Sequence, residues 1–278
     1  MTISQPLATM LVNGVAADTV AVLNRGLMYG DGVFRTLRVV GGRPRYWARH
    51  YRRLVADCSR LAITPPEEAL LKEELDRLIR SAPDCVVKIV VTRGEGGRGY
   101  APPREAHPTR ILLKTALPTY PPHYWETGVR LHLCRLRLAH QPRLAGIKHL
   151  NRLENVLARA EWSDPDVPEG LLLDVEGNVI EGTMTNLFMR QGARLITSDL
   201  SRCGVAGVTR ECILEVAPHL GLTSEERSFG LAELFAADEV LVCNSLIGLW
   251  PVRALEGRQW QPGSLVARLS QSLESLDA

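Results

Sequence analysis

The sequence predicts a mixed α/β protein of two domains. In many short runs apolar residues alternate with the period of a strand, and in other segments they recur with the period of an amphipathic helix. Three prolines within 118–122 predict a linker. We therefore expect an N-terminal domain over 1–117 and a C-terminal domain over 123–278. The strands are too short and the helices too irregular for a regular βαβ series.

The N-terminal domain is expected to combine a sheet with two helices. Asn13-Gly14, between two short apolar stretches, predicts a hairpin turn. Strands are expected at 33–40, 85–92 and 110–116, and a glycine-rich loop separates the last two. Helices are expected at 48–62 and 67–80, because apolar residues recur there on one helical face.

The C-terminal domain is expected to contain more strands than helices. Tight turns such as Glu176-Gly177-Asn178 separate its apolar runs. Strands are expected at 129–136, 171–174, 178–181, 186–189, 194–197 and 240–243. Helices are expected at 150–162, at 208–220 and from residue 263 onward.

Composition narrows the class of protein. The 278 residues are 45% hydrophobic and 23% charged, and 33 basic against 31 acidic residues give a net charge of +2, which does not suggest a nucleic-acid partner. No apolar run approaches the 18 residues of a membrane span, and the N-terminus does not resemble a secretion signal. The six cysteines form neither a CxxC motif nor a Cys/His cluster with zinc spacing, so we expect buried free thiols, no metal site and a cytoplasmic location.

Lys148 is the most informative residue. The chain has only four lysines, so arginine carries nearly all of its positive charge. Arginine stays protonated, whereas lysine can become a nucleophilic amine or form a Schiff base. Lys88 and Lys114 fall in strand patterns and Lys72 in a charged helix, but Lys148 lies among Gly, His and Asn just before a predicted helix. Lys148 is either a Schiff-base lysine or a solvated loop lysine.

Pyridoxal phosphate is the commonest electrophilic partner of a Schiff-base lysine, and it requires a phosphate site and a partner for its pyridine nitrogen. The glycine-bearing segment 201–210 runs into a helix, so its backbone N–H groups can hold an anion, or its glycines can serve only a turn. Glu181 ends a strand just before Gly182. Its carboxylate either keeps a pyridine nitrogen protonated or lies in water.

Three motifs occur in order: Gly-Ile-Lys-His-Leu-Asn-Arg-Leu-Glu around Lys148, Glu-Gly-Thr-Met-Thr-Asn-Leu-Phe from Glu181, and Gly-Val-Ala-Gly-Val-Thr-Arg from Gly204. Together they resemble the fold-type IV pyridoxal-phosphate enzymes, and the similarity runs from Arg25 to about Arg253. The resemblance implies a smaller N-terminal α/β domain, a larger C-terminal domain with a barrel-like sheet, and a homodimer with sites near the subunit interface.

Two further motifs resemble the lyase members of this family. These are Arg-x-x-x-x-Gly-Asp-Gly-x-Phe-x-Thr over 25–36 and Gly-Gly-Arg-Gly-Tyr over 96–100, and His-Leu-Asn-Arg after Lys148 agrees with them. They imply conversion of 4-amino-4-deoxychorismate to 4-aminobenzoate and pyruvate, a step toward folate. The alternatives are a D-amino-acid or branched-chain aminotransferase that uses the same residues, and a binding protein that has lost its cofactor.

The resemblance also assigns roles to individual residues. Lys148 matches the Schiff-base lysine, which would also act as the general base, and Glu181 matches the partner of the pyridine nitrogen. The residues that match phosphate contacts are Arg53, Val208, Thr209, Asn244 and Ser245.

The remaining assignments concern the substrate. Thr36 matches a hydroxyl beside the reacting centre that relays a proton. Arg98, in a loop with four glycines, matches a carboxylate-binding arginine, since a guanidinium can grip a carboxylate through two hydrogen bonds. Tyr29 and Tyr100 are expected to line the pocket.

Two departures from the family pattern affect the choice of substrate more than that of cofactor. Glu181 is followed by Gly-Thr-Met-Thr, which is closer to the aminotransferases than to some lyases. Arg35 stands between Phe34 and Thr36, where a small or polar residue is often seen.

Overall fold

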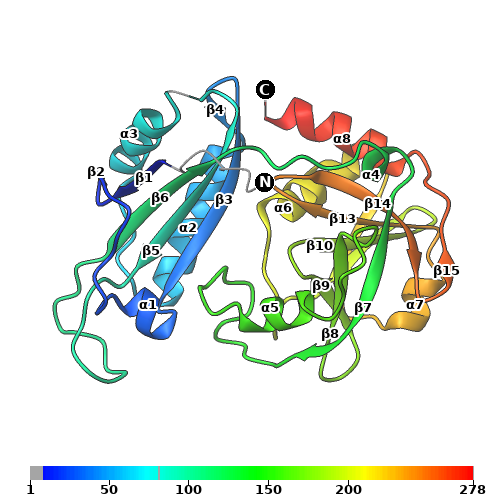
Figure 1. The fold of residues 1–278 in the computed structure, drawn as a ribbon. Coiled ribbons are helices and arrows are strands. Elements are labelled where there is room, and N and C mark those ends of the chain that lie inside the picture. Colours follow the sequence, from blue (N-terminus) through cyan, green and yellow to red (C-terminus); the bar gives the residue numbers. More distant parts are fainter. Residues whose placement is uncertain (1–8, 81, 278) are drawn as a thin grey trace. The chain divides into compact units, whose positions relative to one another are not determined.

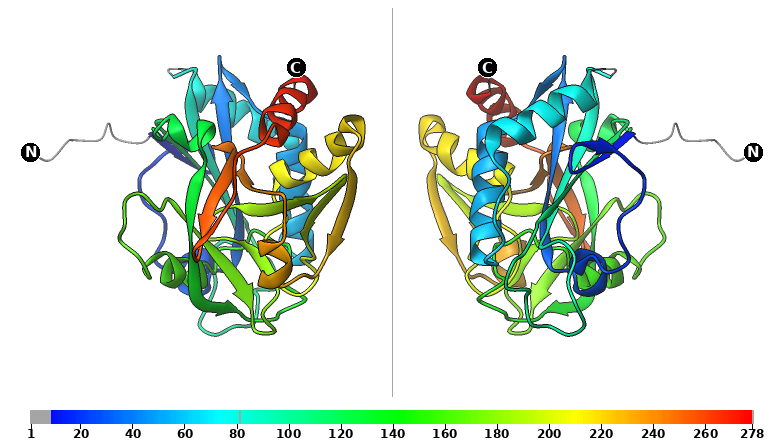
Figure 2. Two further views of the ribbon diagram at one scale, coloured as in Figure 1. Left: turned by 90° about the vertical axis from the view of Figure 1, so that its right-hand side faces the viewer. Right: turned by 90° about the vertical axis from the view of Figure 1, so that its left-hand side faces the viewer.

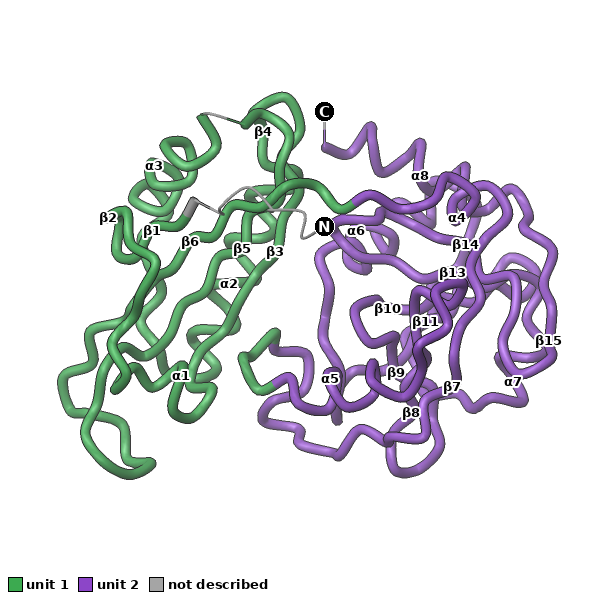
Figure 3. Tube along the Cα trace, viewed as in Figure 1, with its two compact units in different colours: residues 1–118, 148–151 green, residues 119–147, 152–278 purple. Residues whose placement is uncertain are grey.

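The computed structural model describes residues 9–80 and 82–277 (Figure 1). The chain divides into two compact units (Figure 3). Unit 1 comprises residues 1–118 together with 148–151, and unit 2 comprises 119–147 and 152–278. Lys148 and the three residues after it therefore pack with the N-terminal part of the chain.

Unit 1 is one six-stranded sheet with helices packed against it. The strand order is β2-β1-β6-β5-β3-β4, and every described pairing in it is antiparallel. The strands are β1 (Thr9–Val12), β2 (Val15–Ala16), β3 (Gly32–Val40), β4 (Arg43–Pro44), β5 (Cys85–Thr92) and β6 (Thr109–Thr115). The helices are α1 (Arg25–Tyr29), α2 (Trp47–Arg60) and α3 (Glu68–Ile79).

The two faces of this sheet differ in burial. α2 packs on β3, and α3 packs on β6 and β1 (Figure 2). Strand alternation sends Val33, Arg35, Leu37 and Val39 of β3 to the helix-covered face, where all four are buried. Phe34 and Thr36 point to the opposite face and are only half-buried. The face that carries Phe34 and Thr36 is therefore the more accessible of the two along β3.

Unit 2 contains a closed ring of strands. The ring runs β10-β13-β14-β7-β8-β9 and closes because β9 also pairs with β10. Its strands are β7 (Val129–Leu138), β8 (Glu169–Asp174), β9 (Val179–Gly182), β10 (Asn186–Gln191), β13 (Glu239–Asn244) and β14 (Gly248–Leu255). β11 (Arg194–Ser198) extends the sheet from β10, β12 (Thr223–Arg227) pairs with β11, and β15 (Arg258–Gln259) pairs with β14. The closed ring confirms the barrel-like sheet that the family resemblance implies.

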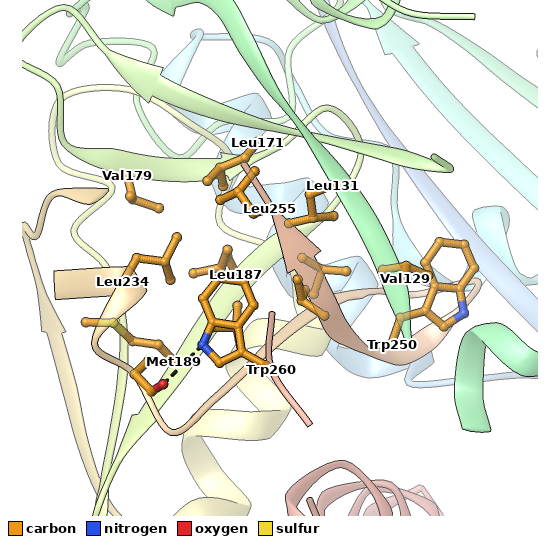
Figure 4. Close-up of a cluster of buried hydrophobic side chains, with 14 of the residues drawn as sticks. Val129, Leu131, Leu171, Val179, Leu187, Met189, Leu234, Trp250, Leu255 and Trp260 are labelled. Carbon is orange, nitrogen blue, oxygen red and sulfur yellow. Dashed lines mark hydrogen bonds between the residues drawn. The ribbon is translucent and has the colours of Figure 1, made fainter. Parts of the chain in front are cut away.

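Alternate residues of the ring strands form one apolar core (Figure 4). Val129 and Leu131 come from β7, and Leu187 and Met189 from β10, with the spacing of two that sends side chains to one face of a strand. Trp260 packs in the same cluster, and its indole N–H donates to the Ala237 carbonyl at 3.0 Å. The ring is thus filled with side chains, so its chemistry must lie at the ends of its strands.

The helices of unit 2 are α4 (His123–Glu126), α5 (Leu153–Arg159), α6 (Val208–Val216), a 3-10 helix (Ala217–Leu220), α7 (Leu231–Phe235) and α8 (Leu265–Leu276). Two predicted helices differ from these bounds. The predicted helix over 150–162 is too long, because the Leu150 N–H already donates to the Gly32 carbonyl. The predicted helix over 208–220 changes to 3-10 geometry after Val216, where Pro218 cannot donate to a helical carbonyl.

Two bulk expectations can be compared with the described residues. All six cysteines are buried and free, as predicted. Within 9–80 and 82–277, no helix has both the length and the apolar character needed to cross a membrane.

Candidate active site

Lys148 belongs to a short segment that runs antiparallel beside β3. The Phe34 N–H donates to the Lys148 carbonyl at 2.9 Å, and the Leu150 N–H donates to the Gly32 carbonyl at 3.0 Å. His149 forms the bridge pair with Val33 between these two bonds. The lysine is therefore fixed to the sheet at its main chain, and it is half-buried.

The Lys148 side chain lies over the ring of Phe34. Its Nζ is 4.7 Å from the ring centroid, and Nζ of Lys88 lies at the same distance from that centroid. Lys88 pairs directly with Thr36 across β3 and β5, so Thr36, Phe34 and both amines share one face of the sheet. Burial lowers the pKa of Lys88.

Arg35 points away from this group of residues. Its guanidinium is buried on the helix-covered face, where it pairs with Asp57 of α2 and donates to the Arg53 carbonyl at 3.3 Å. The side chain that departs from the family pattern is therefore on the opposite face from Thr36. Arg53 itself is half-buried in α2, and its predicted phosphate contact stays a prediction.

The loop that carries Arg98 is held by Arg25. The guanidinium of Arg25 donates to the carbonyls of Gly99, Tyr100 and Ala101 at 3.2, 2.9 and 3.3 Å. Its Nε donates to Asp31 at 2.8 Å. These bonds fix the loop main chain directly after Arg98.

Asp31 joins this loop support to the sheet. Arg93, which follows β5, donates to both Asp31 carboxylate oxygens, at 2.8 and 3.0 Å. Burial acts to raise the pKa of Asp31, but hydrogen bonds from Arg93 and Arg25 outweigh it and hold that pKa below its ordinary value. Asp31 therefore stays ionised between two guanidinium groups.

Arg98 itself is exposed and makes no hydrogen bond within the described part of the chain. The Tyr29 hydroxyl accepts from the Gly99 N–H at 3.3 Å, and the rings of Tyr29 and Tyr100 meet edge to face at 5.4 Å. Tyr100 is 85% exposed. The loop thus carries one uncommitted guanidinium, a group that can hold a carboxylate through two hydrogen bonds.

In unit 2, Glu181 lies at the end of β9 and is 4% exposed. Its Oε2 accepts from the Val205 N–H at 2.8 Å. Asn186, its partner across β9 and β10, donates to the Val205 carbonyl at 2.8 Å and accepts from the Gly207 N–H at 3.1 Å. Glu181 and Asn186 together hold the loop that precedes α6.

That loop leads into α6 with its first N–H groups uncapped. Gly207 is the N-cap residue, no side chain caps the helix, and Val208 and Thr209 form the buried first turn. A Cβ on Gly207 would lie 2.4 Å from Asn186 Oδ1, so only glycine fits against the amide. The free N–H groups and the helix dipole together favour an anion here.

Asn244 is committed to a turn after β13. Its Oδ1 accepts from the N–H groups of Leu246 and Ile247 at 2.8 and 3.0 Å, and its amide donates to the Met184 carbonyl at 3.2 Å. Ser245 is half-buried in the same turn. The predicted phosphate contacts of Asn244 and Ser245 stay predictions. The hydrogen bonds that Asn244 makes here fix the turn.

Sequence reasoning missed four residues that support the candidate site in the two units. Asn186 lies within a quoted motif, but its pairing with the loop depends on long-range register. Asp57 and Lys88 read as ordinary charged positions of a helix and a strand. Glu169 is fully buried at the start of β8, and its carboxylate accepts from Thr183, Met184, Thr185 and Gly170. It fixes the turn that follows Glu181, and no sequence signal marks it.

His140, Asp174 and Cys203 bring three potential metal ligands within 4.8 Å of one another. The Asp174 carboxylate already accepts from the N–H groups of Glu176 and Asn178, from the Asn178 amide and from His140. Burial raises the pKa of the Cys203 thiol to about 12, so it stays protonated. These contacts favour a hydrogen-bonded turn over a metal centre.

Comparison with known proteins places the chain among relatives of two named activities. The model of the family Amino-transferase class IV matches residues 32–255. The chain is 34% identical over 263 residues to the aminodeoxychorismate lyase of Vibrio harveyi. This match covers 95% of this chain and 97% of the relative. It is 30% identical over 264 residues to a putative branched-chain-amino-acid aminotransferase of Methanocaldococcus jannaschii, with 92% and 91% covered.

The fold also matches solved structures. The crystal structure of 4-amino-4-deoxychorismate lyase from Pseudomonas aeruginosa superposes with a TM-score of 0.92 at 51% sequence identity. The match covers 97% of this chain and 100% of that chain.

Proposed function

This chain belongs to the Amino-transferase class IV family, and on that premise we propose that it is a pyridoxal-phosphate-dependent lyase that converts 4-amino-4-deoxychorismate to 4-aminobenzoate and pyruvate. The observation that carries the proposal is the 51% identity, over nearly the whole chain, to the 4-amino-4-deoxychorismate lyase of Pseudomonas aeruginosa. The 34% identity to the Vibrio harveyi lyase supports the same activity.

Each unit, taken by itself, contains residues that suit part of the proposed cofactor. The uncapped N–H groups of Val208 and Thr209, beside a Gly207 that has no room for a Cβ, offer a cradle for phosphate. Glu181 is a buried carboxylate of the kind that would keep a pyridine nitrogen protonated. Lys148 would hold the aldehyde carbon. Arg53, Asn244 and Ser245 are the further proposed phosphate contacts. When bound, pyridoxal phosphate supplies an electron sink to the reacting carbon.

The residues of unit 1 would handle protons and substrate charge. The Lys148 amine would take the proton from the ring carbon that bears the nitrogen. The carbon–oxygen bond to enolpyruvate then breaks as the ring becomes aromatic. The Thr36 hydroxyl, on the same face, passes a proton to the methylene carbon of enolpyruvate, which becomes pyruvate. Arg98 binds a substrate carboxylate, and Tyr29 and Tyr100 line its pocket.

We further propose a cytoplasmic homodimer. Leu153, Val156 and Leu157 occupy one face of α5 and are 74%, 60% and 60% exposed, which supports a protein–protein contact there. Six free buried thiols support a reducing compartment. We also propose that 1–117 and 123–278 are the folding domains and that 118–122 links them. Nothing in the charge balance favours nucleic acid as a partner.

The decisive experiment is incubation of the purified protein with 4-amino-4-deoxychorismate, with 4-aminobenzoate measured by fluorescence after chromatography. We expect product from the wild-type protein and none from Lys148→Ala. The 30% identity to a putative branched-chain aminotransferase makes amine transfer to a keto acid the second candidate. Absence of 4-aminobenzoate together with rapid amine transfer would establish that candidate instead. A purified protein without a yellow, borohydride-sensitive chromophore would favour a binding protein that has lost its cofactor.

A further inference from the structure

We propose that Asp57, held by Arg35, is a positioning residue. It fixes the main chain of Lys148 and so sets the point from which the lysine side chain extends. This inference rests on the proposed function only for its effect on turnover. The contact itself belongs to unit 1 and involves no bound group.

One carboxylate oxygen joins three separate segments. Oδ2 of Asp57, on α2, accepts from the Lys148 backbone N–H at 3.1 Å. The same oxygen is paired with Nη2 of Arg35, on β3. The side chains of Asp57 and Arg35 are only 7% and 3% exposed, so water does not compete for these contacts.

The geometry of the Lys148 segment explains why this carboxylate is needed. The segment pairs with β3 through the Lys148 carbonyl and the Leu150 N–H. A regular antiparallel pair would also direct the Lys148 N–H toward the Phe34 carbonyl, whereas here this N–H donates to the Asp57 carboxylate at 3.1 Å. With Asp57 in place, both the N–H and the carbonyl of Lys148 are bonded, and its Cα is fixed on both sides. The flexible side chain then starts from a fixed point beside Phe34.

Arg35 has two contacts that fix the carboxylate. It pairs with Asp57 and also donates to the Arg53 carbonyl one helical turn earlier in α2. Burial raises the pKa of Asp57, and the Arg35 charge and the Lys148 N–H oppose this rise. Removing either partner of such a buried pair leaves the other uncompensated. The departure of Arg35 from the family pattern is therefore matched by Asp57 on the facing helix.

A matched control pair exists in the same unit. Arg110 of β6 donates to both carboxylate oxygens of Glu74 on α3, at 2.6 to 2.9 Å. Glu74 is as buried as Asp57, and this pair also joins a helix to the sheet. Its contacts do not include the Lys148 segment. Glu74→Gln should therefore reproduce the general loss of stability without any local effect at Lys148.

The test is amide hydrogen exchange at Lys148 in the full-length protein, with the Leu150 amide as internal reference. Asp57→Ala should accelerate exchange at Lys148 about tenfold or more relative to Leu150, because its acceptor is lost. Asp57→Asn keeps a carbonyl acceptor and should keep most of the protection. Arg35→Leu/Asp57→Leu removes both charges together, and so provides a second variant without the acceptor if Asp57→Ala does not fold. Unchanged protection in either variant that lacks the acceptor, or an equal change in Glu74→Gln, would overturn the proposal.

Turnover provides the second readout. Because a displacement of about 1 Å can lower a rate by about a hundredfold, we expect Asp57→Ala to lower kcat for 4-aminobenzoate formation by roughly tenfold to a hundredfold, with little change in KM. Asp57→Asn should recover most of kcat. If the wild-type protein forms no 4-aminobenzoate but Lys148 exchange still depends on Asp57, the proposed function fails and the positioning role stands. If 4-aminobenzoate forms and exchange is indifferent to Asp57, the positioning role fails alone.

Discussion

The two units contribute different kinds of chemistry. Unit 1 presents charged side chains: two amines over the Phe34 ring, a free guanidinium on the Arg98 loop and buried Arg–Asp contacts beneath them. Unit 2 presents mostly backbone N–H groups, with one buried carboxylate and one amide to hold them. On the proposed function, unit 1 would supply the base and the substrate-binding guanidinium, together with Lys148 and Arg53 for the cofactor, whereas unit 2 would supply groups for the cofactor alone. Substitutions in unit 1 should therefore change turnover and KM, and substitutions in unit 2 should change cofactor affinity.

The strongest way to break this division is Lys148→Arg. A guanidinium stays protonated, so the variant has no base at this position, and kcat for 4-aminobenzoate formation should fall by about 10⁴-fold. Lys72→Arg is the control, because Lys72 is an exposed helix lysine paired with Asp76. Its activity should equal that of the wild-type protein. Substantial turnover by Lys148→Arg would remove the assigned base.

Gly207→Ala tests the role of unit 2. The new Cβ would meet Asn186 Oδ1 at 2.4 Å and displace the loop before α6. We expect the Kd for pyridoxal phosphate, measured by fluorescence titration, to rise by more than about tenfold, since one lost charged hydrogen bond has that effect. Gly230→Ala is the control, because Gly230 is also a helix N-cap and its nearest neighbour would be 3.9 Å away. Equal affinities in the two variants would contradict the proposed cradle.

Arg98→Met sharpens the assignment within unit 1. Loss of a charge-assisted contact to a carboxylate should raise KM about 10- to 100-fold with a smaller change in kcat. Arg104→Met, at another exposed arginine of the same loop region, should leave KM unchanged. Steady-state kinetics of both variants decide the point, and an unchanged KM in Arg98→Met would place the substrate carboxylate elsewhere.

His50 provides the smallest expected effect, on stability. It is buried in α2, and burial followed by the charges of Arg35 and Lys148 lowers its pKa to about 3. The unfolded chain takes up a proton near pH 6.5, whereas the folded protein does not until about pH 3, so stability is lost as pH falls through this window. Between pH 7 and pH 5 this group should lower the free energy of unfolding by about 2 kcal/mol.

Urea unfolding at the two pH values measures this effect. The pH dependence should become shallower in His50→Leu, whereas it should persist in His219→Gln, because His219 is exposed. Identical pH dependence in wild-type protein and His50→Leu would show that other groups carry it.

The sequence predicted elements and single residues better than pairings. The apolar run over 33–40 predicted β3, and the two-residue period of a strand places Thr36 and Arg35 on opposite faces of it. The rarity of lysine pointed to Lys148, which the structure fixes to the sheet. Asp57 could not be found in this way, because its role depends on a segment 91 residues away. The same holds for Asn186, whose partners depend on register across the ring. Local period carries no information about such distant contacts.

The ring of unit 2 closes at the β9–β10 hairpin, where Glu181 and Asn186 are its one ladder pair. Glu181, which is proposed to bind the cofactor, therefore also forms the strand pair that closes the barrel. A ligand bound to Glu181 and the α6 loop of the folded protein would stabilise the β9–β10 pairing, and with it the closed ring, by mass action. The stability of the barrel should therefore depend on bound cofactor. With the cofactor, the β9–β10 pairing should resist opening. Without it, the amides of this pairing should be the first in the barrel to exchange.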